Sequence, residues 1–275
     1  MTEILIAALV VTGIGLVCGL ILVLADRFMH VEEDHTFTEI RACLPGANCG
    51  ACGYTGCDGY AKALAADKEG ALATNLCVPG ADAVAAQIAS VLGREAMDVI
   101  EQVAVAGCDG DCNATRVKYE YKGVQSCAAV KMLYGGNGLC SYGCIGLGDC
   151  ASACPNQAIC IKEGIAHIDT RLCTGCGMCA KTCPQHLIRL MPDVEKVVVM
   201  CSNHDKGAQT RKACSHGCIA CHKCEKNCPT GAITVVNNLA SIDYSKCIKC
   251  NKCSDNCPTG AIMIADLSGI HRQRG

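Results

Sequence analysis

The longest apolar stretch of the chain lies near its N-terminus. Residues 4–25 are 22 consecutive positions without a charged side chain, enough for one helix to cross the ~30 Å hydrocarbon layer of a bilayer. A cleaved signal peptide is not favoured, because no basic region precedes the stretch and no small-residue cleavage site follows it. Cys18, inside the stretch, is expected to be a small residue facing lipid. The pattern therefore predicts a single transmembrane anchor over residues 1–26.

Beyond this stretch, apolar residues occur only in short periodic runs. In residues 81–102, Val84, Ile88, Val91 and Leu92 are spaced as on one face of a helix, which predicts a short helix. Short strands are expected at residues 232–236 and 240–243, before the next cysteine run. The pattern predicts an α+β fold made of small units with little apolar core.

The composition indicates what could stabilise such small units. The chain has 28 Cys, no Trp, two Phe and seven Tyr in 275 residues. So many cysteines imply either disulfides or metal ligation. Repeated CxxC runs cannot form disulfides without strain, but they wrap easily around one metal centre. We therefore expect metal sites whose binding contributes much of the folding free energy.

The cysteines of the C-terminal half repeat at an offset of 74 residues. The matching pairs are Cys127 and Cys201, Cys140 and Cys214, Cys144 and Cys218, Cys150 and Cys224, Cys154 and Cys228, Cys173 and Cys247, Cys176 and Cys250, Cys179 and Cys253, and Cys183 and Cys257. The repeat predicts two tandem modules. The expected divisions are a small N-terminal domain at 27–102, a connecting segment with extra Cys at 103–126, and modules at 127–200 and 201–275.

The second module contains C-x2-C-x2-C-x3-C-P twice, and it closely resembles two-cluster bacterial ferredoxins. The resemblance implies two 4Fe-4S clusters, because the fourth Cys of each run, next to proline, binds the other cluster. Zinc is the alternative, but this crossed spacing is more typical of iron–sulfur proteins. The implied ligand sets are Cys218, Cys221, Cys224 and Cys257 for one cluster, and Cys228, Cys247, Cys250 and Cys253 for the other.

The first module departs from this pattern at one position, because Leu147 occupies the place of Cys221. The set Cys154, Cys173, Cys176 and Cys179 is intact. The set Cys144, Cys150 and Cys183 lacks a fourth ligand. Either Cys140 replaces it, or the site holds a three-iron cluster or a ligand other than Cys. We favour Cys140, because the longer loop before Cys144 has the slack to present it.

A further set, Cys49, Cys52, Cys57 and Cys77, stands in a glycine-rich segment of the N-terminal domain. Glycines let the backbone approach inorganic sulfide and donate N–H bonds to it. One more 4Fe-4S cluster is expected here, with Cys43 as a spare thiol.

The cysteines left over suggest a sixth cluster drawn from Cys108, Cys112, Cys127, Cys201 and Cys214. Cys160 is expected to be an ordinary thiol. Five 4Fe-4S clusters are therefore expected, or six if this set is used. Nucleotide-binding glycine loops in a strand-to-helix context are missing, so we expect an electron carrier without a catalytic residue or substrate site of its own.

The order of an N-terminal anchor, the motif LPGANCGACGYTGC, the loop YGCIGLGDC and ferredoxin-like repeats resembles the B subunit of the Rnf complex, in its longer clostridial form. The resemblance implies a membrane-bound, ion-translocating (Na+ or H+) ferredoxin:NAD+ oxidoreductase. In this family reduced ferredoxin is the electron donor, and flavin and nicotinamide sites belong to partner subunits. No nucleic-acid partner is expected. The alternatives are a stand-alone polyferredoxin serving another membrane reductase or hydrogenase, and a structural metal protein.

Charge suggests both an orientation and a docking face. Arg27 and Arg41 follow the apolar stretch and Glu3 precedes it, which favours a single-pass cell-membrane protein with its bulk on the cytoplasmic side. Residues 206–252 carry eight Lys and Arg against two acids, whereas residues 26–112 carry 14 acids against five Lys and Arg. Bacterial ferredoxins are typically acidic, so the basic second module is expected to attract the donor.

Overall fold

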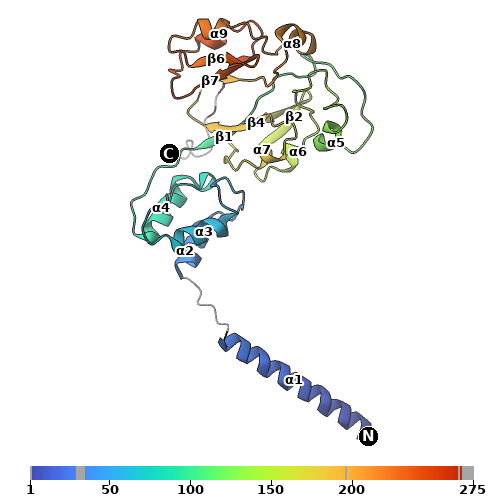
Figure 1. Cartoon of the computed structure of the whole chain (residues 1–275), viewed down its shortest axis with the longest axis vertical. Coiled ribbons are helices and arrows are strands. Elements are labelled where there is room, and N and C mark those ends of the chain that lie inside the picture. Colours follow the sequence, from blue (N-terminus) through green and yellow to red (C-terminus); the bar gives the residue numbers. More distant parts are fainter. Residues whose placement is uncertain (1, 29–34, 196, 266, 268–275) are drawn as a thin grey trace.

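The computed structural model describes residues 2–28, 35–195, 197–265 and 267. The parts of the predicted domains at 29–34 and 268–275 lie outside these described residues. The apolar stretch forms helix α1 (Thr2–Phe28), which stands apart from the other elements in Figure 1. Its side chains are described at positions 6, 9 and 12–24. Over the described residues, no helix has both the length and the apolar character needed to span a membrane, so the expected anchor is not confirmed.

The N-terminal domain is built from three helices, α2 (His35–Cys43), α3 (Cys57–Ala66) and α4 (Ala81–Leu92), with a 3-10 turn at Val78–Gly80. The predicted helical spacing in α4 is confirmed, and Ile88 is fully buried. Ile40, Tyr60 and Leu64 complete the core with it. The helix ends at Gly93, whose left-handed φ of 64° lets its N–H bond back to the last turn. This domain therefore has an apolar core of its own.

The cysteine-rich part of the chain contains only two-stranded antiparallel sheets among the described residues. The paired strands are β1 (Gln102–Ala106) with β4 (Ile188–Pro192), β2 (Ile159–Lys162) with β3 (Ile165–Ile168), β5 (Val197–Val199) with β8 (Ile262–Ile264), and β6 (Ile233–Val236) with β7 (Leu239–Ile242). Helices of four to seven residues lie between them: α5 (Cys127–Lys131), α6 (Asp149–Ser152), α7 (Met178–Thr182), α8 (Gly207–Ala213), α9 (Lys223–Lys226) and α10 (Lys252–Asp255).

Each module combines one hairpin with one long-range strand pair. In the first module these are β2–β3 and β1–β4, and in the second they are β6–β7 and β5–β8, so the predicted division at 200/201 separates β5 from its partner. The expected strands at 232–236 and 240–243 correspond to β6 and β7. Strand β1 crosses the predicted boundary at 102/103 and lies mostly in the segment expected to be a connector, and its pairing with β4 joins that segment to the first module. The two modules lie side by side in Figure 1.

Candidate iron–sulfur centres

The second module has two hollows, each lined by four cysteines. One is lined by Cys218, Cys221, Cys224 and Cys257, and the other by Cys228, Cys247, Cys250 and Cys253. These are the two crossed sets that the ferredoxin resemblance implies. Burial raises the pKa of Cys224 to about 11, and the neighbouring thiols of Cys218 and Cys221 add to the rise. Four thiols around one hollow are a donor set that suits a 4Fe-4S cluster.

Two of these eight cysteines reach the surface. Cys221 and Cys250 are exposed, whereas Cys218 and Cys224 are buried. Lys223 and Lys226 on α9 and Lys252 on α10 are exposed as well. The second module therefore presents ligand sulfurs and positive charge on its surface.

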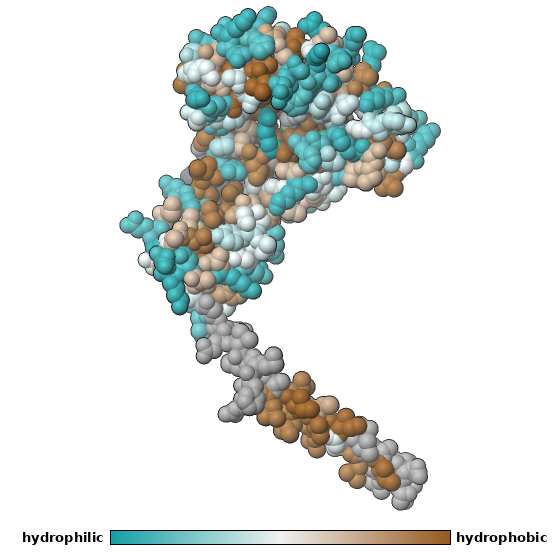
Figure 2. Space-filling model, in the orientation of Figure 1, coloured by the Kyte–Doolittle hydropathy of each residue, from teal (hydrophilic) through white to brown (hydrophobic). Residues whose placement is uncertain are grey.

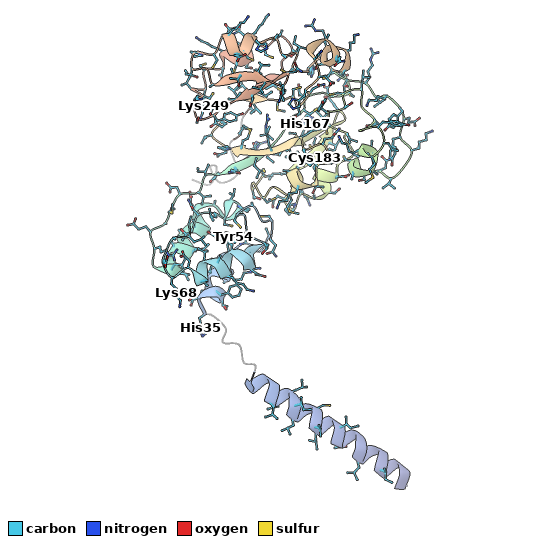
Figure 3. All side chains as sticks on the ribbon, in the orientation of Figure 1. His35, Tyr54, Lys68, His167, Cys183 and Lys249 are labelled. Carbon is cyan, nitrogen blue, oxygen red and sulfur yellow. The ribbon has the colours of Figure 1, made fainter. Side chains whose placement is uncertain are left out.

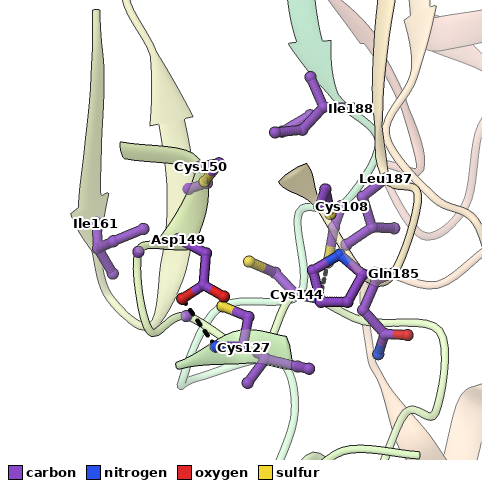
Figure 4. A pocket seen from close by; sticks show the side chains of 16 residues that line it. Cys108, Cys127, Cys144, Asp149, Cys150, Ile161, Gln185, Leu187 and Ile188 are labelled. Carbon is purple, nitrogen blue, oxygen red and sulfur yellow. Dashed lines mark hydrogen bonds between the residues drawn. The ribbon is translucent and has the colours of Figure 1, made fainter. Parts of the chain in front are cut away.

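In the first module, the hollow of Cys144, Cys150 and Cys183 has two further thiols in its lining, Cys127 and Cys108. Figure 4 shows Cys127, Cys144 and Cys150 turned toward the same space. The pKa of Cys150 is raised to about 11, mainly by burial, and the thiols of Cys183 and Cys127 contribute to this rise. Cys140, the predicted replacement for Leu147, is not part of this lining. Of the two further thiols, Cys127 is the one that contributes to the raised pKa of both Cys144 and Cys150.

Asp149 holds Cys127 in this position. Its carboxylate accepts hydrogen bonds from the backbone N–H groups of Cys127 (2.9 Å) and Ala128 (3.1 Å) and from the hydroxyl of Ser126 (2.9 Å). Figure 4 shows the bond to Cys127. Burial raises the pKa of Asp149, but these hydrogen bonds outweigh it and lower the pKa below its ordinary value. The first turn of α5 is therefore fixed to α6, which also carries Cys150.

The set Cys154, Cys173, Cys176 and Cys179 gathers around Cys179. Burial raises the pKa of Cys179 to about 12, with the thiols of Cys173, Cys176 and Cys154 contributing. Backbone N–H groups of Ala104 and Ala158 point to the sulfurs of Cys173 and Cys154, each at 3.4 Å. N–H donors of this kind tune the potential of a bound cluster.

The set Cys49, Cys52, Cys57 and Cys77 lies within the N-terminal domain. Burial raises the pKa of Cys77 to about 11, and the other three thiols of the set contribute. The side-chain oxygen of Asn48 accepts the N–H of Cys57 at 2.9 Å and so fixes the start of α3. Cys43 is half-buried on α2.

This domain touches the first module through Cys49. The ammonium group of Lys181, on α7, donates a hydrogen bond to the carbonyl oxygen of Cys49 at 2.7 Å. The pKa of Cys176 is raised by burial, and the Cys49 thiol contributes to that rise. The N-terminal set thus neighbours the set that contains Cys176.

One further hollow lies between the modules, and its lining includes Cys108, Cys140, Cys201 and Cys214. Cys144 lines it too, from the neighbouring site. Of the residues expected for a sixth cluster, Cys112 is exposed and outside this lining, and Cys127 lies in the first-module hollow. Cys160 is exposed on β2. Among the described residues, no three His, Cys, Asp or Glu side chains converge on a single metal-ion position.

Comparison with known proteins agrees with this arrangement. An Fe-S cluster family matches residues 44–79, and 4Fe-4S dicluster domains match residues 172–232 and 217–262. The B subunit of the ion-translocating oxidoreductase complex of Methanosarcina acetivorans is 40% identical over 86% of this chain and 89% of its own length. The B subunit of the proton-translocating ferredoxin:NAD(+) oxidoreductase complex of Clostridium ljungdahlii is 41% identical over 89% of this chain and 86% of its own length. The chain belongs to the RnfB family.

A further RnfB relative is the B subunit of the Na(+)-translocating ferredoxin:NAD(+) oxidoreductase complex of Acetobacterium woodii. It is 41% identical over 87% of this chain and 73% of its own length. The predicted family is thereby confirmed, and the stand-alone polyferredoxin is not favoured. The iron–sulfur domains that this chain shares with known families are suited to electron transfer.

Proposed function

We propose that this chain is the electron-entry subunit of an ion-translocating ferredoxin:NAD+ oxidoreductase complex. It would accept electrons from reduced ferredoxin and pass them to flavin- and NAD-binding partner subunits. The observation that carries the proposal is the series of four-thiol groups from the exposed Cys221 and Cys250 of the second module to Cys49 of the N-terminal domain. Bound 4Fe-4S clusters would supply one-electron transfer at these positions.

Four of the sites have a complete set of thiols in the expected combination. They are Cys49, Cys52, Cys57 and Cys77; Cys154, Cys173, Cys176 and Cys179; Cys218, Cys221, Cys224 and Cys257; and Cys228, Cys247, Cys250 and Cys253. The thiols would hold the clusters, and the N–H groups directed at their sulfurs would stabilise the charged form.

We also propose that α1 anchors the chain in the cell membrane as a single pass, with the bulk on the cytoplasmic side. The support is the uncharged stretch 4–25 and the exposure of large apolar side chains along it. Leu9, Leu16 and Leu22 are 70–74% exposed, and an apolar face of this kind is stable in lipid but not in water. Figure 2 shows the apolar colour along α1.

The second module is the proposed docking face for ferredoxin. Lys223, Lys226 and Lys252 are exposed next to its cysteine loops. Lys249, labelled in Figure 3, is less available, because its ammonium group donates to the carbonyl of Val194 at 3.0 Å and lies 3.7 Å from the carboxylate of Glu195. An acidic donor would be steered by the exposed lysines.

The test is ferredoxin-dependent reduction of the anaerobically purified full chain, followed by stopped-flow absorbance. The double variant Lys223→Glu, Lys252→Glu should lower the second-order rate several-fold at low ionic strength, and the difference should shrink at high salt, where charges are screened within ~10 Å or less. Lys118→Glu, Lys122→Glu makes the same charge change on the exposed connecting segment and is the control. Equal rates for wild type and the first variant at low salt, with all iron retained, would contradict the docking face.

A further inference from the structure

We infer that Cys127 is the fourth ligand of the first-module site, and that Cys108, Cys140, Cys201 and Cys214 hold a sixth 4Fe-4S cluster that joins the two modules. The inference deepens the proposed function, because it places a cluster where electrons would cross from one module to the other.

Strand pairing gives a different alignment of the two modules from the 74-residue offset of the cysteines. Strand β1 pairs with β4 as β5 pairs with β8. After β1, the N–H of Gly107 donates to the carbonyl of Leu187 at 2.8 Å, and after β5 the N–H of Met200 donates to that of Ala261 at 2.8 Å. The residues that follow β1 are therefore equivalent to those that follow β5.

This equivalence pairs Cys108, and not Cys127, with Cys201. The sulfur of Cys108 accepts the N–H of Cys144 at 3.4 Å, and the sulfur of Cys201 accepts the N–H of Cys218 at 3.3 Å. Cys144 and Cys218 are the matching first ligands of their modules. Cys108 and Cys201 therefore occupy the same place beside them.

Cys140 and Cys214 are the second equivalent pair, four residues before Cys144 and Cys218. Each module thus supplies two matching thiols to the hollow between the modules. A cluster bound there would be held by two pairs related by the internal repeat. Such a site needs both modules and belongs to neither alone.

The number of residues between these equivalent cysteines explains why the first module has the additional thiol of Cys127. Cys108 precedes Cys144 by 36 residues, whereas Cys201 precedes Cys218 by 17. The extra length of the first module contains α5, which Asp149 fixes against α6. Cys127 therefore reaches the hollow that Leu147 leaves one thiol short, and Cys140 remains for the intermodule hollow.

The intermodule hollow has the features of the other sites. Cys108, Cys201 and Cys214 are 7–9% exposed. Asn203 donates its side-chain N–H to the sulfur of Cys140 at 3.3 Å and its backbone N–H to that of Cys201 at 3.4 Å. Buried thiols with N–H groups aimed at their sulfurs suit a cluster of thiolates and sulfides.

The position also fits a path between modules. The N–H of Cys218 links the Cys201 sulfur to one of the second-module sites, and the N–H of Cys144 links the Cys108 sulfur to the first-module site. Across the boundary, the ring of His216 bonds to the carbonyl of Asp109 at 2.8 Å. The two modules are thus fixed around the hollow.

Double variants of the anaerobically purified full chain test which cysteines share a cluster, with iron, zinc and sulfide measured per chain. Wild type should hold about 24 irons, from six clusters of four. Cys140→Ala and Cys214→Ala should each remove about four irons, and together still about four, because they affect one cluster. Cys127→Ala with Cys140→Ala should remove about eight. The reverse result, about eight for the first pair and about four for the second, would overturn the inference.

A rescue separates loss of a ligand from loss of folding. Leu147→Cys restores the spacing of the second module, so it should return about four irons and the corresponding paramagnetic resonance signal to Cys127→Ala but not to Cys140→Ala. Cys160→Ala, on an exposed thiol of β2, should leave iron unchanged. Rescue of Cys140→Ala, or stoichiometric zinc in place of the sixth cluster, would overturn the assignment. Failure of ferredoxin to reduce a chain with full iron would instead count against the proposed function alone.

Discussion

Individual polar groups hold the N-terminal domain together around its thiols. The hydroxyl of Tyr60 donates to the carbonyl of Ala73 at 2.8 Å and accepts the N–H of Leu76 at 3.4 Å. Tyr60 is 1% exposed, and its ring contacts that of Tyr54 in a tilted arrangement, with 5.3 Å between centroids. Leu76 immediately precedes Cys77, so this hydroxyl helps to place the last ligand of the first set.

Replacing Tyr60 by Phe should therefore destabilise this domain by about 1 kcal/mol, because two half-buried backbone groups lose a partner. The expected result is a lower midpoint of anaerobic thermal unfolding and faster iron loss. Tyr54→Phe keeps the ring contact and is the control. An unchanged midpoint for Tyr60→Phe would show that the hydroxyl contributes nothing.

The same residue predicts a pH dependence. Burial raises the pKa of Tyr60 from about 10 to about 12, despite the N–H of Leu76, which lowers it. The unfolded tyrosine ionises first as pH rises, so its contribution to stability is complete below pH 10 and is lost between pH 10 and about 12. Tyr60→Phe should flatten this part of the stability profile, measured by unfolding at fixed temperature.

At the level of the elements, turns allow the cysteine loops to approach the hairpins. Gly146, between Cys144 and Cys150, has a φ of +78°, and a Cβ there would collide with the carbonyl oxygen of Gly164 in the β2–β3 turn. The loop and the hairpin can pack this closely because Gly146 carries no side chain.

Gly146→Ala should cost more than the ~1–2 kcal/mol of left-handed strain alone, because the hairpin must also move away. The first-module hollow should then lose iron faster. Gly164→Ala is the matched control, because its φ is +79° but its Cβ would meet open space. Equal effects of the two variants in anaerobic iron-release assays would contradict the role of the close approach.

Among the elements, the cysteine loops could be predicted from the sequence, whereas the long-range strand pairs could not. The regular spacing predicts which thiols surround each hollow of the second module, because three cysteines of one run and the last cysteine of the other line each of them. The division at 126/127 separates β1 from its partner β4, because strand pairing over 80 residues leaves no local pattern. Cys127 precedes Cys201 by the repeat offset of 74 residues. In the structure, however, Cys108 takes the position equivalent to Cys201, because the first-module segment is longer. Only the packing of β1 reveals this.

Across the whole molecule, the N-terminal domain and the modules differ in what fills their cores. Ile40, Tyr60, Leu64 and Ile88 are at most 1% exposed in the N-terminal domain. In two buried clusters of the modules, cysteines pack among the apolar residues. Metal binding to such modules is also folding free energy.

Removal of iron by a chelator should therefore unfold the modules before the N-terminal helices. Hydrogen exchange measured by mass spectrometry should show loss of amide protection in β2–β3 and β6–β7, with partial protection kept in α3 and α4. The iron-loaded chain under the same conditions is the control. Protection in the hairpins that survives complete iron removal would contradict this dependence.

The exposure of Cys221 and Cys250 also determines how the protein would be damaged by dioxygen. A sulfur that a soluble donor can approach is also within reach of dioxygen, since accessible thiolates oxidise first. The buried sulfurs of Cys108, Cys201 and Cys214 lack this access. Oxidative damage would thus begin in the second module and move inward, so the chain would lose its capacity to receive electrons while its inner sites were still intact.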